Sequence, residues 1–497
     1  MSDLSHDART GTVVANIPTS TPEEVRDVVA RAAAAAPAVA AATPAERRHW
    51  LVAVADAVQD SPAAAELVRV ADRETALGEA RLTSELVRCA DQLRFYGDVG
   101  VEASYLRVTV DHATDTTPDL RRMQVPLGPV AVLGASNFPF AFGALGNDTG
   151  SAIAAGCPVV AKAHPAHPQT SALLATVATT ALVDAGAPEG ALGLVAGFEA
   201  GEALVRSPEV AAVAFTGSQR GGLAVWRQAI ERDVVIPVYA EMGTVNPVVM
   251  TAAAAARTEE IAAGFVGSFT LGAGQFCTKP GLLLAPAGYD VPARVAAALQ
   301  NARPTGWLLT EGISSAYGSG VAELVGAGAE VLGRVPGPAE GWSADATVLV
   351  VAAADLKPGS RLLEECFGPV ALVAEYADQH ELTEVLEALQ GALAASVMSA
   401  GAEDPETPHL VGVLAPLVGR VAVDDWPTGV AFTWAQQHGG PWPATTFPSA
   451  TSVGAAALDR FTRPVTWQSA PASALPPALQ EDNPWRLPRR VDGELMT

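Results

Sequence analysis

Apolar and polar positions change periodically from residue 125 onward, in an order that predicts strands followed by helices. Residues 126–136 (PLGPVAVLGAS) predict a buried strand, 146–156 (GNDTGSAIAAG) a helix and 158–163 (PVVAKA) another strand. The same alternation continues to VYAEMG, and a second run covers residues 251 to about 423. Strands alternating with helices indicate parallel, doubly wound sheets, so we expect an α/β protein whose ligands bind at the carboxyl ends of strands.

The two ends of the chain have a different character. Thr-Pro-x-Glu sequences beginning at Thr21 and Thr43 combine an N-cap, a proline at the first helical position and a capping-box glutamate, so each predicts the start of a helix. From about Arg463 the chain is rich in proline without a clear period. We therefore expect the C-terminal stretch to lie extended on a surface or on a partner.

Composition excludes several classes of protein. A chain of 497 residues with 49% hydrophobic and 17% charged residues is typical of an ordered protein of two or three domains. The net charge of -23 argues against a nucleic-acid partner. Residues 123–147 carry no charge, but their prolines and glycines argue against a membrane span. The polar N-terminus lacks the pattern of a signal peptide, and four cysteines without a C-x-x-C pair predict reduced thiols in a cytoplasmic protein.

Three residues are candidates for chemistry. Cys277 lies in GAGQFCTKP, where glycines permit close approach of a ligand and Lys279 adds positive charge that would help a thiol to ionise. Glu241 follows an apolar strand, and Asn137 in GASNFPF could donate its amide to an oxyanion. Each also has a plain structural alternative: a buried hydrophobic thiol, a capping or ion-paired carboxylate, and a turn asparagine.

The sequence has no G-x-G-x-x-G motif after its first strand. Gly326-x-Gly328 lacks the third glycine and is interpreted as a loop. A strand running into Thr216-Gly217-Ser218 and then Gly222 offers a helix N-terminus that could receive a pyrophosphate, although an ordinary strand-to-helix turn has the same sequence features.

Six segments in this order, GASNFP, VVAKAHPAHP, FTGS, EMG, GQFCTK and EECFGPV, resemble the aldehyde dehydrogenase superfamily across nearly the whole chain. AKAHPAHPQTS, EMGTVNPVV and HGGPWPAT are similar to two of its branches, the α-ketoglutaric semialdehyde (2,5-dioxopentanoate) dehydrogenases and the bacterial NADP-dependent fatty aldehyde dehydrogenases. The resemblance implies a Rossmann-like cofactor domain at 1–105 and 127–240 and a catalytic domain at 241–430. It also implies a β oligomerisation arm at 106–126 and 456–497, and a homodimer or homotetramer.

The resemblance also assigns roles. Cys277 would be the nucleophile, Glu241 the general base, and Asn137 with the Cys277 backbone N–H the oxyanion hole, with no metal. The implied cofactor contacts involve the adenosine ribose, the pyrophosphate and the nicotinamide ribose, through Lys162, His164, Gly217, Ser218, Gly222, Glu365 and Phe367.

The choice between NAD and NADP stays open, with NADP favoured. Many NAD-preferring relatives carry a glutamate where this chain has Pro165, so a carboxylate that would repel a 2′-phosphate is missing. Against this, Phe198 and Glu199 stand where an arginine for that phosphate is expected.

The expected reaction is oxidation of a small-molecule aldehyde, with α-ketoglutaric semialdehyde to 2-oxoglutarate favoured. Arg460, Arg463 or Thr433 could contact such a carboxylate-bearing substrate, whereas an apolar tunnel lined by Phe142, Phe432 and Trp434 would suit a fatty aldehyde. Acyl transfer to coenzyme A and an inactive scaffold are further alternatives, and the presence of Glu241 with Cys277 argues against both.

Overall fold

The N-terminal helices begin where their capping boxes predict. The computed structural model describes residues 2–60 and 62–496; residues 1, 61 and 497 of the predicted domain ranges lie outside them. Helices α1 (Pro22–Ala41) and α2 (Pro44–Gln59) follow N-caps Thr21 and Thr43. In each cap the threonine hydroxyl accepts the backbone N–H of the glutamate three residues later, and that glutamate accepts the threonine N–H at 2.7 Å. The predicted starts are confirmed.

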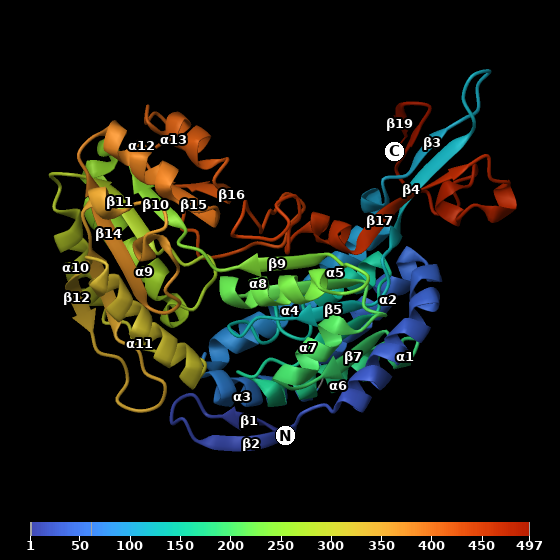
Figure 1. The fold of residues 1–497 in the computed structure, drawn as a ribbon, viewed down its shortest axis with the longest axis horizontal. Coiled ribbons are helices and arrows are strands. Elements are labelled where there is room, and N and C mark those ends of the chain that lie inside the picture. The colour runs from blue at the N-terminus through green and yellow to red at the C-terminus, as the bar shows by residue number, and fades with distance from the viewer. Residues whose placement is uncertain (1, 61, 497) are drawn as a thin grey trace.

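The first sheet is parallel throughout, with the strand order β7-β6-β5-β8-β9. Alternate residues of its strands face opposite layers: Val130 and Val132 pack in the core under α2 and α4, while Ala131 packs with residues of α1, α7 and α8. Figure 1 shows helices on both faces. The strands are β5 (Val130–Leu133), β6 (Val159–Lys162), β7 (Leu192–Val195), β8 (Ala212–Gly217) and β9 (Val238–Met242). The helices around them are α3 (Ala63–Thr75), α4 (Glu79–Glu102), α5 (Asn147–Ala155), α6 (Pro168–Asp184), α7 (Phe198–Arg206) and α8 (Gln219–Ile230).

The second sheet has seven strands in the order β12-β13-β14-β11-β10-β15-β16. Six are parallel, as expected of a doubly wound domain, and the edge strand β12 runs antiparallel to β13. The strands are β10 (Pro247–Met250), β11 (Leu282–Pro286), β12 (Glu330–Val335), β13 (Ala346–Val350), β14 (Val370–Tyr376), β15 (Ala392–Met398) and β16 (Val418–Val423). The helices of this lobe are α9 (Thr258–Thr270), α10 (Val291–Ala302), α11 (Glu311–Gly326), α12 (Gln379–Ala388) and α13 (Thr407–Leu414).

A third sheet projects from the body as an arm (Figure 1). Its order is β17-β4-β3-β18-β19, so it joins residues before the first sheet to the last residues of the chain. The C-terminal stretch therefore contains strands, as the resemblance implied for a β arm, although its proline-rich sequence has no strand pattern. The strands are β3 (Thr109–Asp111), β4 (Leu120–Pro126), β17 (Thr462–Gln468), β18 (Arg489–Val491) and β19 (Glu494–Met496).

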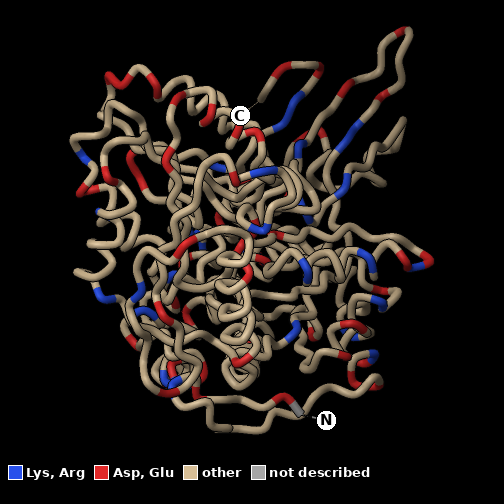
Figure 2. The backbone as a smooth tube through the Cα atoms, turned by 60° about the vertical axis from the view of Figure 1, so that its left-hand side comes forward, with Lys and Arg blue, Asp and Glu red and all other residues tan. Residues whose placement is uncertain are grey.

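A hairpin of β1 (Ser2–His6) and β2 (Val13–Pro18) precedes α1 and was not predicted. Charged residues of both signs are interspersed along the backbone (Figure 2). Within residues 2–60 and 62–496, no helix is long and apolar enough to cross a bilayer.

Candidate active site

Two strand ends and one loop bring the candidate chemical groups together. In the first sheet, Thr216 of β8 pairs with Glu241 of β9, which places Glu241 at the carboxyl edge. Asn137 lies in the loop after β5, whose last residue Leu133 ends at the same edge. Cys277 follows a short 3-10 turn, Leu271–Gly274, at the end of α9 in the other lobe. The site therefore lies where the two lobes meet, as expected for carboxyl ends of parallel strands.

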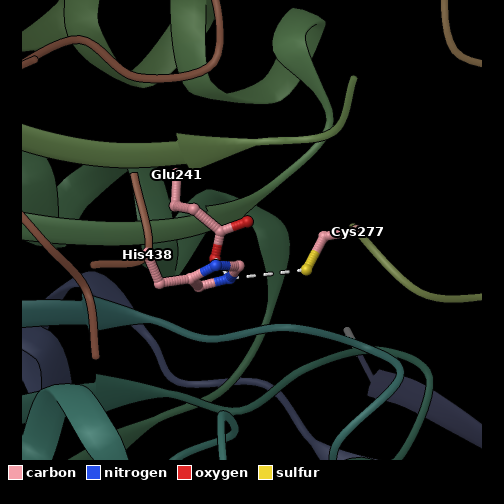
Figure 3. A group of neighbouring side chains, drawn as sticks. All are labelled: Glu241, Cys277 and His438. Atoms are coloured by element: carbon pink, nitrogen blue, oxygen red, sulfur yellow. Dashed lines mark hydrogen bonds and ion pairs between the residues drawn. The ribbon is translucent and has the colours of Figure 1, made fainter. Parts of the chain in front are cut away.

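His438 lies between Cys277 and Glu241 (Figure 3). Its Nε2 is 3.6 Å from Sγ of Cys277 and 3.2 Å from Oε2 of Glu241. His438 and Glu241 are almost fully buried, with 1% and 3% of their surface exposed, while Cys277 is partly exposed. Neither carboxylate oxygen of Glu241 has an aligned hydrogen bond within the described residues. The side chains of Glu241, His438 and Cys277 thus form one compact cluster, with their donor atoms within 4.8 Å of one another.

The backbone holds His438 in this position. Its N–H donates to Oγ1 of Thr451 at 2.8 Å, and the following segment runs beside β9. There the N–H of Met242 donates to the carbonyl of Ala444 at 2.8 Å, and the N–H of Thr446 donates to that of Ala240 at 3.2 Å. The sequence HGGPWPAT begins at His438 but predicted no role for it, because this residue lies 161 positions from Cys277.

Asn137 contacts the loop of Cys277. Its side-chain Nδ2 donates to the carbonyl of Gln275 at 2.7 Å, and the residue is buried. An amide carries two N–H donors, so one remains for another acceptor. The structure thus brings together all three predicted catalytic residues, Cys277, Glu241 and Asn137.

The thiol lies in an unfavourable electrostatic setting. Burial raises the pKa of Cys277 well above its ordinary value, and the negative charges of Glu241 and Glu365 add to this effect. The expectation that Lys279 assists the thiol is wrong, because its buried ammonium donates to the carbonyls of Cys366 and Val370, each at 2.8 Å. The imidazole of His438 is the basic side chain in contact with the thiol.

The predicted cofactor residues follow the same edge of the first sheet. Lys162 ends β6, and burial lowers its pKa to about 8. Ser218 is the N-cap of α8, where its hydroxyl accepts the N–H of Gly221 at 3.2 Å. A Cβ on Gly222 would lie 2.6 Å from Sδ of Met242, so this glycine permits close helix-to-strand packing. The first turn of α8 offers N–H groups to an anion.

His164 and His167 form a stacked pair beside Lys162, with ring centroids 5.3 Å apart. Nδ1 of His164 accepts the N–H of Ala166, while His167 lies within hydrogen-bond distance of the Ala135 carbonyl and the Ser171 hydroxyl. Burial lowers the pKa of both imidazoles, to about 4 for His167. His164 is consequently a neutral, partly exposed ring, and His167 joins the loops after β5 and β6.

Comparison with known proteins then defines the family. Residues 4–407 match the model of the aldehyde dehydrogenase family. The chain belongs to the aldehyde dehydrogenase family. The enzyme is 43% identical to alpha-ketoglutaric semialdehyde dehydrogenase 2 of Azospirillum brasilense, over 90% of this chain and 87% of that protein. It is 37% identical to the alpha-ketoglutaric semialdehyde dehydrogenase of Acinetobacter baylyi, over 88% and 85%. A 3,6-anhydro-L-galactose dehydrogenase solved in complex with NAP shares the fold, with a TM-score of 0.81 at 21% identity, over 94% and 96%.

This aldehyde dehydrogenase is therefore an oxidoreductase that converts aldehydes to acids with NAD(P), and the predicted fold and enzyme class are confirmed. Its residues fit such a cofactor. The ammonium of Lys162 has no ion pair or hydrogen bond within the described residues, and the N-terminus of α8 follows β8, which β5 alone separates from β6. A cation and a helix N-terminus at one sheet edge match the needs of ribose and pyrophosphate groups.

Glu365 turns inward in this dehydrogenase. A Cβ on Gly243 would lie 2.1 Å from its carboxylate, and its Oε1 has no hydrogen-bond partner among the described residues. Burial raises the pKa of Glu365 to about 7, against the lowering effect of Lys279. Glu365 thus lies close enough to the thiol to affect it, while Phe367 follows it as a partly exposed ring.

The cluster of Glu241, Cys277 and His438 also has the donor types of a metal site. One donor atom each from Glu241, Cys277 and His438 lies within 4.8 Å of the others. Sequence reasoning expected no metal, and the same three groups suffice for proton transfer and nucleophilic attack.

Proposed function

We propose that this enzyme oxidises α-ketoglutaric semialdehyde to 2-oxoglutarate through a covalent intermediate on Cys277. The observation that carries the catalytic part is the contact of the Cys277 thiol with His438, beside the buried carboxylate of Glu241. The substrate rests on the two α-ketoglutaric semialdehyde dehydrogenases that resemble this chain over most of their length.

Proton transfer from the thiol to Nε2 of His438 begins the reaction. The resulting imidazolium would lie between two anions, at 3.6 Å from the thiolate sulfur and 3.2 Å from the Glu241 carboxylate. This arrangement offsets the burial that raises the thiol pKa. The thiolate sulfur then forms a bond to the aldehyde carbon, and the carbonyl π electrons move to the oxygen.

Asn137 and the backbone N–H of Cys277 stabilise the oxyanion. Preorganised donors at the position where charge develops lower the barrier most effectively in a water-poor site. A bound nicotinamide, which Glu365 and Phe367 would hold by its ribose, would supply the hydride acceptor needed to turn this adduct into a thioester on Cys277. Glu241 takes a proton from water, the hydroxide attacks the thioester, and the acid leaves as the thiolate returns.

The cofactor contacts are part of the proposal. Lys162 and His164 bind the adenosine ribose; Gly217, Ser218 and Gly222 approach the pyrophosphate; and Glu365 with Phe367 holds the nicotinamide ribose. Glu365 must turn from its inward position to do so. NADP is favoured over NAD, because Pro165 supplies no carboxylate to repel a 2′-phosphate.

The domain division, the assembly and the location complete the proposal. The three sheets support a cofactor domain at 1–105 and 127–240, a catalytic domain at 241–430 and an arm at 106–126 and 456–497. The arm ends in edge strand β19, whose Leu495 is 64% exposed, and such an edge favours pairing with a second copy in a homodimer or homotetramer. A catalytic thiol is best preserved in the reducing cytoplasm.

Initial rates of NAD(P)H formation test the proposal. α-Ketoglutaric semialdehyde, succinic semialdehyde and a long-chain aldehyde are each compared with NAD and NADP, for the wild type and Cys277→Ala. The dioxo acid should give the highest kcat/KM, and Cys277→Ala should be inactive. Preference for long-chain aldehydes would refute the substrate, and an active Cys277→Ala would refute the mechanism.

A further inference from the structure

One face of α4 carries two arginines on the side of the candidate active site. Arg81, Glu85 and Arg88 are spaced at i, i+4 and i+7, so they share a helix face. Arg81 and Arg88 are both partly exposed, whereas Glu85 is buried. None of these residues was predicted from the sequence to take part in the site.

Arg81 contacts both segments that carry reacting groups. Its Nη2 donates to the backbone carbonyl of Asn137 at 2.8 Å. Its guanidinium carbon lies 5.1 Å from the ring centroids of both Phe138 and Phe276, which are the chain neighbours of Asn137 and Cys277. Cation–π contact with two rings fixes the plane of the guanidinium at this position.

Neither arginine is paired with a carboxylate. Within the described residues no acidic oxygen lies within ion-pair distance of Arg81 or Arg88, although most ion pairs of this acidic chain involve arginine. Nη1 of Arg81 and Nε of Arg88 are buried and have no hydrogen-bond partner there. A guanidinium with unmet donors in an apolar setting is costly, and a ligand carboxylate would satisfy it.

Glu85 does not supply the missing carboxylate partner of the two arginines. Its Oε1 accepts the backbone N–H groups of Phe140 and Ala141, at 2.8 and 3.1 Å. Burial raises the pKa of Glu85 to about 7, so its negative charge is incomplete near neutral pH. The guanidinium groups of Arg81 and Arg88 therefore give this face of α4 a net positive charge.

We propose that Arg81 binds the distal carboxylate of the aldehyde substrate and so selects an oxo-acid aldehyde over a neutral one. This inference rests on the proposed function and names the residue that recognises its substrate class. Arg81 is next to the reacting groups, whereas Arg88 lies about 10 Å further along the helix axis and contacts Phe142 and Phe432 instead. A five-carbon substrate attached to Cys277 is short, which favours the nearer arginine.

The arginines expected from the sequence are placed elsewhere. Arg460 is buried and forms an ion pair with Asp148 at 2.8 Å. Arg463 is an exposed residue of β17 in the arm sheet. Gly272 leaves room for the guanidinium of Arg81, because a Cβ on this glycine would lie 2.5 Å from Nη1.

Substitution by methionine tests the proposal, because methionine retains a long apolar side chain without the charge. Arg81→Met, the matched control Arg88→Met and the wild type are assayed with α-ketoglutaric semialdehyde and with pentanal, a neutral aldehyde of equal carbon number. Arg81→Met should raise the KM for the anionic substrate roughly 10- to 100-fold, the range for a lost charge-assisted hydrogen bond, with pentanal kinetics little changed. Arg81→Lys should recover part of the loss.

Four other results overturn the inference. Equal losses of kcat/KM for pentanal and the anionic aldehyde would show that Arg81 only positions the Asn137 loop. A larger selective effect of Arg88→Met would place the carboxylate at Arg88. If the wild type itself does not prefer the anionic aldehyde, the proposed function fails together with this inference. If the wild type prefers the anionic aldehyde and Arg81→Met retains this preference, only the role of Arg81 in substrate selection is refuted. Arg81→Gln provides a second neutral variant should Arg81→Met not fold.

Discussion

Replacing His438 by asparagine should slow the reaction of Cys277 with electrophiles. The substitution removes the base that contacts the thiol at 3.6 Å and leaves the acidic neighbours Glu241 and Glu365, which raise the thiol pKa. At 3.6 Å an imidazolium stabilises a thiolate by about 5 kcal/mol for an effective dielectric constant of about 20. Loss of this energy raises the thiol pKa in the variant and lowers the thiolate fraction at a given pH by roughly three orders of magnitude.

The expected loss of rate is smaller than that change in ionisation. A thiolate of higher pKa is intrinsically more nucleophilic, with a Brønsted coefficient of about 0.5, so roughly half of the logarithmic change remains. Iodoacetamide should therefore alkylate Cys277 roughly 50-fold more slowly in His438→Asn at neutral pH, and the pH dependence should move upward.

Alkylation is followed by intact mass against time from pH 6 to about 10, a range that covers the ordinary thiol pKa. Cys277→Ala measures any background from the three buried cysteines. His380→Asn, at an exposed histidine of α12, makes the same chemical change away from the site. A wild-type rate and pH profile in His438→Asn would refute the role of His438 as the thiol's base.

Further predictions concern Glu241, His167 and metal ions. Glu241→Gln should lower turnover roughly 100-fold or more through loss of the general base and accumulate an acyl-enzyme visible by mass. Because Glu241 raises the thiol pKa, alkylation of Cys277 should not be slowed in that variant. Failure to detect an acyl-enzyme in Glu241→Gln would contradict the role of Glu241 in deacylation. His167 has a folded-state pKa of about 4, below its ordinary 6.5, so stability should fall as pH drops through this window, by about 3 kcal/mol. Urea midpoints should show this loss in the wild type and less of it in His167→Gln; equal pH dependence would contradict it. Micromolar Zn²⁺ should inhibit reversibly through Glu241, Cys277 and His438, with activity restored by EDTA; unchanged activity at that concentration would show that the three donors do not converge on an ion.

The sequence predicted elements whose signals are local. The capping boxes at Thr21 and Thr43 are complete within four residues, and the buried strands of both large sheets are short apolar runs between turns. The arm was expected only from the family resemblance and not from a strand pattern, because β17 pairs with β4, more than three hundred residues earlier, and a strand in such a sheet needs no apolar run of its own.

The candidate site shows the same limit. Cys277, Glu241 and Asn137 stood out through a family resemblance, whereas His438 lies in a segment rich in glycine and proline whose position depends on pairing with β9. Arg81 is a single charged residue on a long helix. The position of Arg81 in the site depends on contacts with two phenylalanines in distant segments, and no local sequence pattern predicts those contacts.

The reacting groups come from separate segments: the loop after β5, the end of β9, the turn after α9 and the strand-like segment beside β9. Neither lobe carries a complete set. Errors in reacting geometry of about 1 Å can lower the rate roughly a hundredfold. The turnover number is therefore a sensitive measure of how the two lobes are aligned. Any ligand, crowding agent or substitution that shifts one lobe against the other would change the turnover number, even though each lobe keeps its own fold.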